Sequence, residues 1–219
     1  MHITKQTIRG SPFVGVLAIA TESVSIVPKG MEKKELNALG ETLDVDAIQA
    51  TIANSPLIGS LAKALGKKMV VPEIVERKEV EFLESQGLKV KTIDGIAALG
   101  NLIALNENGM LLSPSIEKRQ QKEIERFFGI PAQSFTIAGS DLVGSGITCT
   151  KQGFIAHPKI LQKEFNALKK LFCVSGKATS VNYGDAFVGN SVLANAYGAL
   201  VGTNTTPSEL LRIDEGLGG

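Results

Sequence analysis

The chain has few of the side chains on which most enzyme chemistry depends. Its 219 residues include no tryptophan, two histidines (His2 and His157) and two cysteines (Cys149 and Cys173). Two such cysteines do not make a disulfide framework, and they suit a reducing compartment. No Cys-x-x-Cys, His-x-x-x-His or mixed cluster of histidines and carboxylates has the spacing of metal ligands. The sequence therefore predicts no catalytic constellation, no cofactor and no metal site.

Charge and hydropathy argue against two further classes. The net charge is +1 and the isoelectric point is about 7.7, so no bulk attraction to nucleic acid or to a membrane surface is expected. No uncharged apolar run approaches the roughly 20 residues that span a bilayer. No apolar segment of the kind found in secretory signals follows Met1. We expect a soluble cytoplasmic protein without a membrane partner or a small-molecule substrate.

A nine-residue pattern occurs five times and organises the chain. The fourth copy runs from Thr136 to Gly144 and reads Thr-Ile-Ala-Gly-Ser-Asp-Leu-Val-Gly. Each copy ends in a glycine, here called an anchor glycine, and successive anchors are 41 to 45 residues apart. A period in this range marks a repeat architecture. We therefore predict a single domain, 1–219, of five repeats of about 44 residues, with anchors at Gly15, Gly59, Gly100, Gly144 and Gly189.

Each repeat predicts the same order of elements. A strand ends in the Thr-Ile pair, a tight turn follows, and the anchor glycine begins a β-hairpin. In the third repeat the apolar segments 102–105 and 110–112 flank Asn106-Glu107-Asn108-Gly109, a strong hairpin signal. A helix closes the repeat, and its clearest apolar stripe, which Cys173 is expected to extend, is Leu161, Phe165, Leu168 and Phe172. The expected strands are 3–8, 45–52, 88–93, 134–137 and 178–181.

The two ends of the chain complete one another. Thr206-Pro207-Ser208-Glu209 begins a last helix with a capping threonine and a proline at the first helical position. The strand that follows the helix in other repeats is missing there, and the N-terminal strand 3–8 supplies it. The array therefore closes into a ring, a five-fold pseudosymmetric α/β propeller with sheets near the axis and helices outside. An open solenoid would instead have capping repeats at both ends.

Known five-fold α/β propellers, the penteins, include guanidine-modifying hydrolases that use a cysteine nucleophile. In this chain Cys149 lies in a hairpin strand and Cys173 at the end of a helix stripe, where burial in the core is the commoner role of a free thiol. His157 precedes Pro158 at the position that Ser113 holds in the third repeat, so a small polar or capping group suffices there. A cysteine hydrolase and a generic protein-binding ring remain alternative functions.

The repeats differ in the residue directly after each anchor glycine. These five residues are expected to form a circle at one mouth of the ring, either as satisfied turns or as a contact surface: Val16, Ser60, Asn101, Ser145 and Asn190. Nearby polar groups that are expected to contact a partner are Lys63, Asn106, Tyr183, Asn195 and Tyr197.

Three segments carry a resemblance to a known family. They are Ala97-Ala98-Leu99-Gly100-Asn101, the stretch 149–159 ending Gly-Phe-Ile-Ala-His-Pro-Lys, and the stretch 202–210. The chain resembles the ribosome anti-association factors, which include archaeal translation initiation factor 6, from end to end. The resemblance implies the same ring fold and a non-enzymatic, monomeric protein that binds the large ribosomal subunit. It implies contact with a ribosomal protein beside the sarcin–ricin loop, with some rRNA, through a face that includes Ser60 and Asn101.

Overall fold

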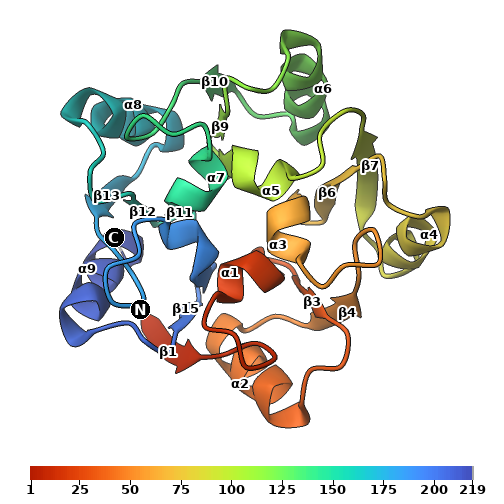
Figure 1. The fold of residues 1–219 in the computed structure, drawn as a ribbon, viewed down its shortest axis with the longest axis horizontal. Helices are drawn as coiled ribbons and strands as arrows, with labels where there is room; N and C mark the ends of the chain where they lie inside the picture. Colours follow the sequence, from red (N-terminus) through yellow and green to blue (C-terminus); the bar gives the residue numbers. More distant parts are fainter. Residues whose placement is uncertain (219) are drawn as a thin grey trace.

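Residues 1–218 are described by a computed structural model in which five three-stranded sheets surround a central axis (Figure 1). In each sheet a middle strand pairs antiparallel with an inner strand and parallel with an outer strand. The predicted five-fold α/β propeller is therefore confirmed. The sheets are β2 (Ile19–Ala20), β3 (Ser25–Pro28) and β4 (Ala47–Ala50); β5 (Lys63–Leu65), β6 (Lys68–Pro72) and β7 (Lys89–Ile93); β8 (Ile103–Leu105), β9 (Met110–Leu112) and β10 (Ala132–Ser134); β11 (Ile147–Cys149), β12 (Gly153–Ala156) and β13 (Ser175–Ala178); β14 (Val192–Ala194), β15 (Gly198–Gly202) and β1 (His2–Gln6).

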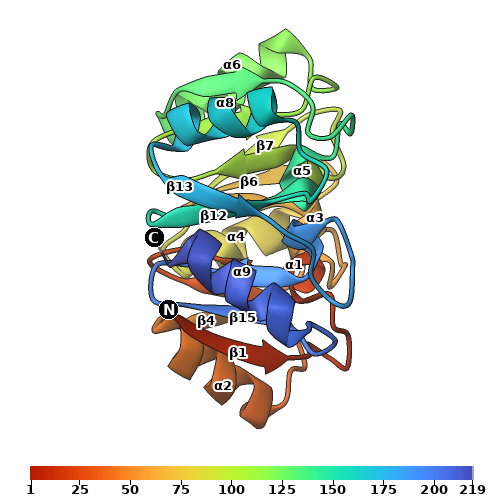
Figure 2. The same ribbon diagram turned by 90° about the vertical axis from the view of Figure 1, so that its left-hand side faces the viewer.

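Helices of two kinds surround these sheets. Long helices lie on the outside of the ring: α2 (Lys33–Leu43), α4 (Arg77–Ser85), α6 (Lys118–Phe128), α8 (Gln162–Phe172) and α9 (Pro207–Leu217). Single helical turns lie around the axis: α1 (Val14–Leu17), α3 (Ile58–Leu61), α5 (Leu99–Leu102), α7 (Val143–Gly146) and the 3-10 turn η1 (Val188–Asn190). Figure 2 shows these turns on one face of the ring, here called the helix face. No helix in residues 1–218 is long and apolar enough to cross a membrane.

The N-terminal strand closes the ring as predicted. β1 pairs parallel with β15 from His2–Gly198 to Gln6–Gly202, and the two strands lie side by side in both views (Figures 1 and 2). The sheet of the fifth repeat is thus built from both ends of the chain, and its middle strand has a partner on each side. Closure in this way leaves no open end to the array of repeats.

Apolar side chains fill the wedges between neighbouring sheets. One cluster joins Leu39 and Leu43 of α2 to Val27 of β3 and to Leu193 and Leu200 of the sheet next to it. Four similar clusters fill the other wedges. Because each cluster takes side chains from two repeats, a repeat cannot bury its apolar surface alone.

The recurrent Thr-Ile pair lies beyond the strand in most repeats, which corrects the expected strand ends. β1, β4, β10 and β13 end two or three residues before the isoleucine or valine. In the first repeat Ile8 exchanges two backbone hydrogen bonds with Ser11, and the same narrow bridge joins Ile52 to Ser55 and Ile137 to Ser140. Only β7 includes its Thr-Ile pair, Thr92 and Ile93. The isoleucine is still buried, and in the first repeat Ile8 belongs to the same apolar cluster as Val14 and Leu17 of the short helix.

The residues of the nine-residue pattern that follow the isoleucine form the turn that this bridge closes. The two residues between its ends have left-handed backbone angles, as Arg9 (φ 52°) and Gly10 (φ 77°) show, which is the geometry of a type I′ turn. The serine that follows then accepts a hydrogen bond from the backbone two residues later: Ser11 from Phe13, Ser55 from Leu57 and Ser140 from Leu142. Asp185 does the same for Phe187. The pattern therefore forms a tight turn that reverses the chain direction and leads into the short helix.

The anchor glycines are required by close packing at the axis. Each is the second residue of a short helix, and none has a left-handed backbone angle, so the sequence-based role as the start of a hairpin was wrong. A Cβ atom on Gly59 would overlap the carbonyl oxygen of Gly15, and one on Gly100 would overlap that of Gly59. The same overlap occurs between the remaining neighbours and closes a circle of five glycines.

The third residue of each long helix ties that helix to the tight turn before the short helix of the same repeat. Glu79 accepts hydrogen bonds from the backbone of Glu76 at its own helix start and of Asn54 in the turn after β4 (both 3.0 Å). The equivalent bonds to turns are Arg9 to Glu35, Ala138 to Glu164 and Gly184 to Glu209. In the third repeat the polarity is reversed, because the Gln120 amide donates to the Asp94 carbonyl (2.7 Å). Only the last of these capping residues was expected from sequence.

The glycine circle predicts a sharp contrast between two glycine-to-alanine changes. Gly59→Ala places a methyl group against the backbone of Gly15 and 2.6 Å from the Ala18 carbonyl oxygen, so we expect the free energy of unfolding to fall by about 3 kcal/mol or more. Gly40→Ala, in the open middle of α2, has nothing within 4 Å of the new carbon and should stabilise by about 0.5–1 kcal/mol. Urea denaturation measures both. Equal stability of the Gly59→Ala variant and the wild type would contradict the packing role.

Glu209 predicts a pH-dependent contribution to stability. Burial raises the pKa of its carboxyl group, but hydrogen bonds from Thr206, Ser180 and Gly184 outweigh burial and lower the pKa from 4.5 to about 2. The charged carboxylate therefore stabilises the fold above pH 4.5, and this stabilisation is lost as the pH falls toward 2. We expect Glu209→Gln to lower the free energy of unfolding by about 2 kcal/mol at pH 7.

Denaturation at several pH values checks this. The gap between the wild type and Glu209→Gln should close between pH 4.5 and pH 2. Glu84→Gln, on the exposed side of α4, is the matched control and should cost almost nothing. A gap for Glu209→Gln that stays constant down to pH 2.5 would show that the carboxylate charge is not involved.

Candidate functional site

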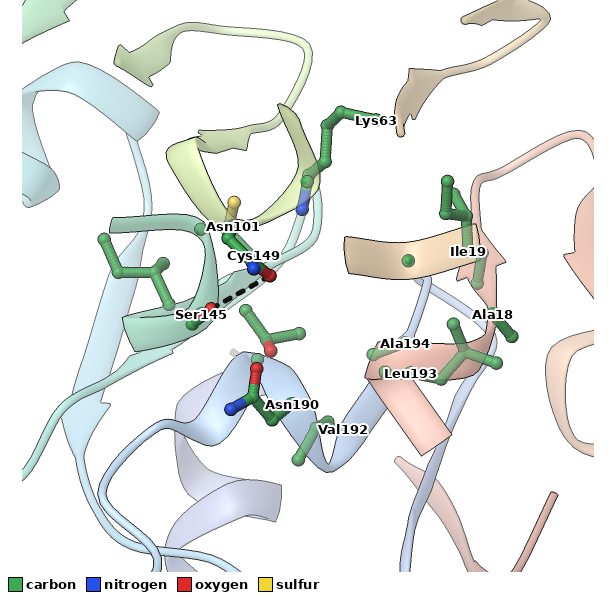
Figure 3. A pocket seen from close by; sticks show the side chains of 18 of the residues that line it. Ala18, Ile19, Lys63, Asn101, Ser145, Cys149, Asn190, Val192, Leu193 and Ala194 are labelled. Carbon is green, nitrogen blue, oxygen red and sulfur yellow. Dashed lines mark hydrogen bonds between the residues drawn. The ribbon is translucent and has the colours of Figure 1, made fainter. Parts of the chain in front are cut away.

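A cavity of about 80 Å³ lies on the ring axis and is lined by residues of all five repeats (Figure 3). The anchor glycines form part of its wall, together with the inner strands β2, β5, β8, β11 and β14. Three of the residues that follow an anchor, Asn101, Ser145 and Asn190, also line it. Val16 and Ser60 hold the equivalent places in α1 and α3 and are half-buried. The structure thus brings three of the five expected residues to the axial cavity, and the full circle stays a prediction.

Two members of this circle interact with each other. The Ser145 hydroxyl donates to the Asn101 side-chain oxygen over 3.2 Å, across the boundary between α5 and α7. Ser145 itself is buried, so its predicted role as a partner contact is replaced by this internal hydrogen bond. Asn101 and Asn190 are half-buried.

Lys63 and Cys149 face the same cavity. Lys63 begins β5, and its ammonium group points toward the space beside Asn101 and Cys149 (Figure 3). Desolvation lowers the pKa of the Lys63 ammonium group, with a smaller opposite effect from Cys149. Desolvation likewise raises the pKa of the Cys149 thiol to about 12, and the thiol donates to the Leu105 carbonyl (3.0 Å). A thiol of such high pKa is not a nucleophile at neutral pH.

Asn106 and Asn195 are structural, which corrects their expected role as partner contacts. Both are almost fully buried, at 2% and 1% exposure. The Asn106 amide nitrogen donates to the carbonyls of Thr150 (3.1 Å) and Phe172 (3.0 Å), and its oxygen accepts from the backbone of its own hairpin turn. Asn195 makes the same set of bonds, to Thr21 and Leu43. Each asparagine thus fastens one hairpin turn to the next repeat. The shared sequence signal is Asn-x-x-Gly at the turn.

Two other candidates from the sequence have local roles. His157 accepts a hydrogen bond from the backbone of Lys159 (3.1 Å), as Ser113 does from Ser115, which confirms that the position holds a capping group. Cys173 is exposed and ends α8 with a left-handed backbone angle (φ 55°). The expectation that Cys173 extends the buried stripe was therefore wrong, because the stripe ends at Phe172. No group of three His, Cys, Asp or Glu side chains within 1–218 is arranged to hold a metal ion.

The helix face carries exposed apolar side chains that sequence reasoning did not single out. Phe13, Leu57 and Leu142 precede α1, α3 and α7 at equivalent positions, and each is about two-fifths exposed (43%, 42% and 42%). Tyr183, in the turn that leads to η1, is 83% exposed. The equivalent residues of the other repeats are Ala98 and Phe187, so this position is apolar in every copy. Repeated exposed apolar groups on one face indicate a surface for another macromolecule.

Comparisons with known proteins point to one family. A family model described as eIF-6 family matches residues 3–216. Translation initiation factor 6 of Pyrococcus horikoshii is 32% identical over 100% of this chain and 99% of its own length. The protein of the same name from Methanocaldococcus jannaschii is 37% identical over 99% of this chain and 98% of its own.

Among solved structures, a dimethylarginine dimethylaminohydrolase in an adduct with S-methyl-L-thiocitrulline is similar at a TM-score of 0.48 and 15% identity. The match covers 93% of this chain and 72% of the hydrolase. This similarity is too distant to bear on the function of the chain.

The environments of the two thiols predict different reactivity. At pH 8 a thiol of pKa about 12 is thiolate in about one molecule in ten thousand, so Cys149 should not react with Ellman's reagent in the folded protein. Cys173 is exposed and should react at once. We expect one reactive thiol per folded chain, two in denaturant, and none in folded Cys173→Ser. Rapid reaction of Cys149 in the folded Cys173→Ser variant would contradict this prediction and support a role for Cys149 as a nucleophile.

Proposed function

This chain belongs to the eIF-6 family, and we propose that it binds the large ribosomal subunit and thereby keeps the small subunit from joining. Its role is that of a translation initiation factor, since the family model matches nearly the whole chain and the full-length relatives bear that name. The mechanism is steric: a rigid ring that covers the joining surface of one subunit excludes the other. It requires a docking surface and no chemistry.

The helix face is the proposed docking surface. The observation that carries this is the recurrence of an exposed apolar side chain at the same place in three repeats: Phe13, Leu57 and Leu142. Ser60 lies three residues after Leu57, whereas Asn101, Asn190 and the exposed ring of Tyr183 lie near the equivalent positions of the third and fifth repeats, Ala98 and Phe187. Apolar anchors with a polar surround are the usual composition of a protein–protein interface, and about 1,600 Å² suffices for a specific one.

The helix face suits a ribosomal protein as its partner better than bare RNA. The net charge of +1 and the apolar character of the helix face favour a protein surface, here the ribosomal protein beside the sarcin–ricin loop, with a smaller contact to rRNA. The proposed factor acts as a monomer in the cytoplasm, where ribosomal subunits join. A dimer formed through the helix face would compete with ribosome binding.

A guanidine-modifying hydrolase is the alternative function. It needs a cysteine thiolate near a histidine, whereas the Cys149 thiol has a raised pKa and donates to a backbone carbonyl. The ring nitrogen Nδ1 of His157 is engaged as an acceptor by the backbone of Lys159. These contacts favour a protein without catalytic activity.

Sucrose-gradient sedimentation with purified archaeal subunits tests the proposed function. We expect the protein to sediment with isolated large subunits and to remain at the top of the gradient with small subunits or joined ribosomes. Excess protein added before the small subunit should reduce the joined-ribosome peak. Failure to sediment with large subunits at both low and moderate salt would overturn the proposal.

A pair of variants tests the helix face. Leu57→Asp puts a charge in the proposed interface at the N-cap of α3, a position that accepts aspartate, and should weaken subunit binding at least tenfold without unfolding the ring. Leu211→Asp makes the same change at a more exposed leucine of the outer helix α9 and should bind normally. Equal affinities of the two variants would show that the helix face is not the interface.

A further inference from the structure

The cavity on the ring axis contains one charged side chain. Lys63 is the only Asp, Glu, Lys or Arg residue in its described lining, which otherwise consists of glycines, small apolar residues and a few polar groups. No carboxylate of residues 1–218 forms an ion pair with it, although six other pairs are present. A desolvated ammonium group without a counter-charge is costly, and pairing with an anion relieves that cost.

The ring does not require this lysine for packing. Lys63 is the fourth residue after its anchor glycine, and the equivalent positions hold Ile19, Ala104, Thr148 and Leu193. Four uncharged side chains therefore build the same part of the wall in the other repeats. The charge at Lys63 breaks the symmetry at the centre of the molecule without serving the fold.

Hydrogen-bond donors accompany the ammonium group. Because Ser145 donates to the Asn101 side-chain oxygen, the Asn101 amide nitrogen is left as a donor, and no acceptor for it occurs in residues 1–218. The Thr148 hydroxyl also lines the cavity and has no partner among the hydrogen bonds of the described residues. A cation with two neutral donors is a favourable environment for an anion.

Two carboxylates lie in a hollow that adjoins the cavity. Glu22 and Glu107 line this second hollow at the hairpin turns, which shares one residue of each inner strand with the cavity: Ala20, Ala64, Leu105, Cys149 and Ala194. Glu22 is partly neutralised there by Lys151 (3.9 Å) and accepts the backbone N–H of Ala196. These groups leave the Lys63 charge uncompensated within the cavity itself.

From this arrangement we infer that the central cavity is a binding site for a small inorganic anion, held by Lys63, Asn101 and Thr148. A volume of about 80 Å³ has room for a halide with several waters or for one tetrahedral oxyanion. The anion neutralises the Lys63 charge inside the cavity and stabilises the closed ring. The inference does not depend on the proposed ribosome contact, although Asn101 belongs to both sites.

Thermal unfolding at constant ionic strength tests the inference. Sodium gluconate, whose anion is too large for the cavity, is exchanged stepwise for sodium chloride in one series and sodium phosphate in another. We expect the melting temperature of the wild type to rise by a few degrees and to saturate in at least one series, because a ligand of the folded state shifts the unfolding equilibrium. The series that gives the saturable rise identifies the anion.

Lys63→Met removes the charge with little change of volume, and Lys34→Met on the exposed side of α2 is its matched control. The Lys63→Met variant should lose the anion response, whereas Lys34→Met should respond as the wild type does. The same response in Lys63→Met as in the wild type, or no response in the wild type, would overturn the inference.

A second measurement needs no variant. Wild-type crystals are grown in sodium bromide and, separately, in sodium selenate, which stand in for chloride and for tetrahedral oxyanions. We expect an anomalous-difference peak beside the Lys63 ammonium group in at least one of them. Its absence in both would overturn the inference whatever the melting curves show.

Discussion

The backbone contact between neighbouring anchor glycines is the constraint on which the rest of the ring depends. Each glycine lies so close to the carbonyl oxygen of the glycine before it that no side chain fits between them. These glycine contacts bring five short helices together at one axis, where the small cavity also lies. The five sheets are arranged around that axis. Since every wedge shares its apolar cluster with a neighbour, we propose that residues 1–219 fold as one domain of five repeats.

Comparison of equivalent positions in the five repeats separates residues that build the ring from residues that are specific to this protein. Positions that match in every repeat, such as the anchor glycine, the buried isoleucine and the capping residue of the long helix, hold the ring together. Positions that differ carry the information specific to this protein. Lys63 in the cavity and Asn101 at its wall break the symmetry inside the ring. Tyr183, on an inserted residue of the fifth turn, breaks it outside.

The spacing of the glycines was enough to predict five repeats, and the missing last strand was enough to predict closure. Local patterns also identified the hairpin around Asn106-Gly109 and the helix that ends at Phe172. Local patterns failed where the deciding contact lies in another repeat. The partners of Asn106 are 44 and 66 residues away, so a buried tie between repeats was mistaken for an exposed turn.

The candidate site was harder to predict than the fold. Phe13, Leu57 and Leu142 are of residue types that are usually buried, and only the ring geometry shows that they are exposed together on one face. Conversely, serine is usually exposed, but Ser145 is buried and donates a hydrogen bond to Asn101. Side-chain type alone does not separate a satisfied turn from a contact surface when symmetry brings both to the axis.

We propose that the helix face of this ring docks on the large ribosomal subunit. Electron cryo-microscopy of the protein bound to archaeal large subunits tests it most directly. We expect α1, α3 and α7 to face the subunit, with Phe13, Leu57 and Leu142 covered and the outer helices in solvent. A complex in which the hairpin turns or the outer helices make the contact, with these three residues exposed, would contradict it.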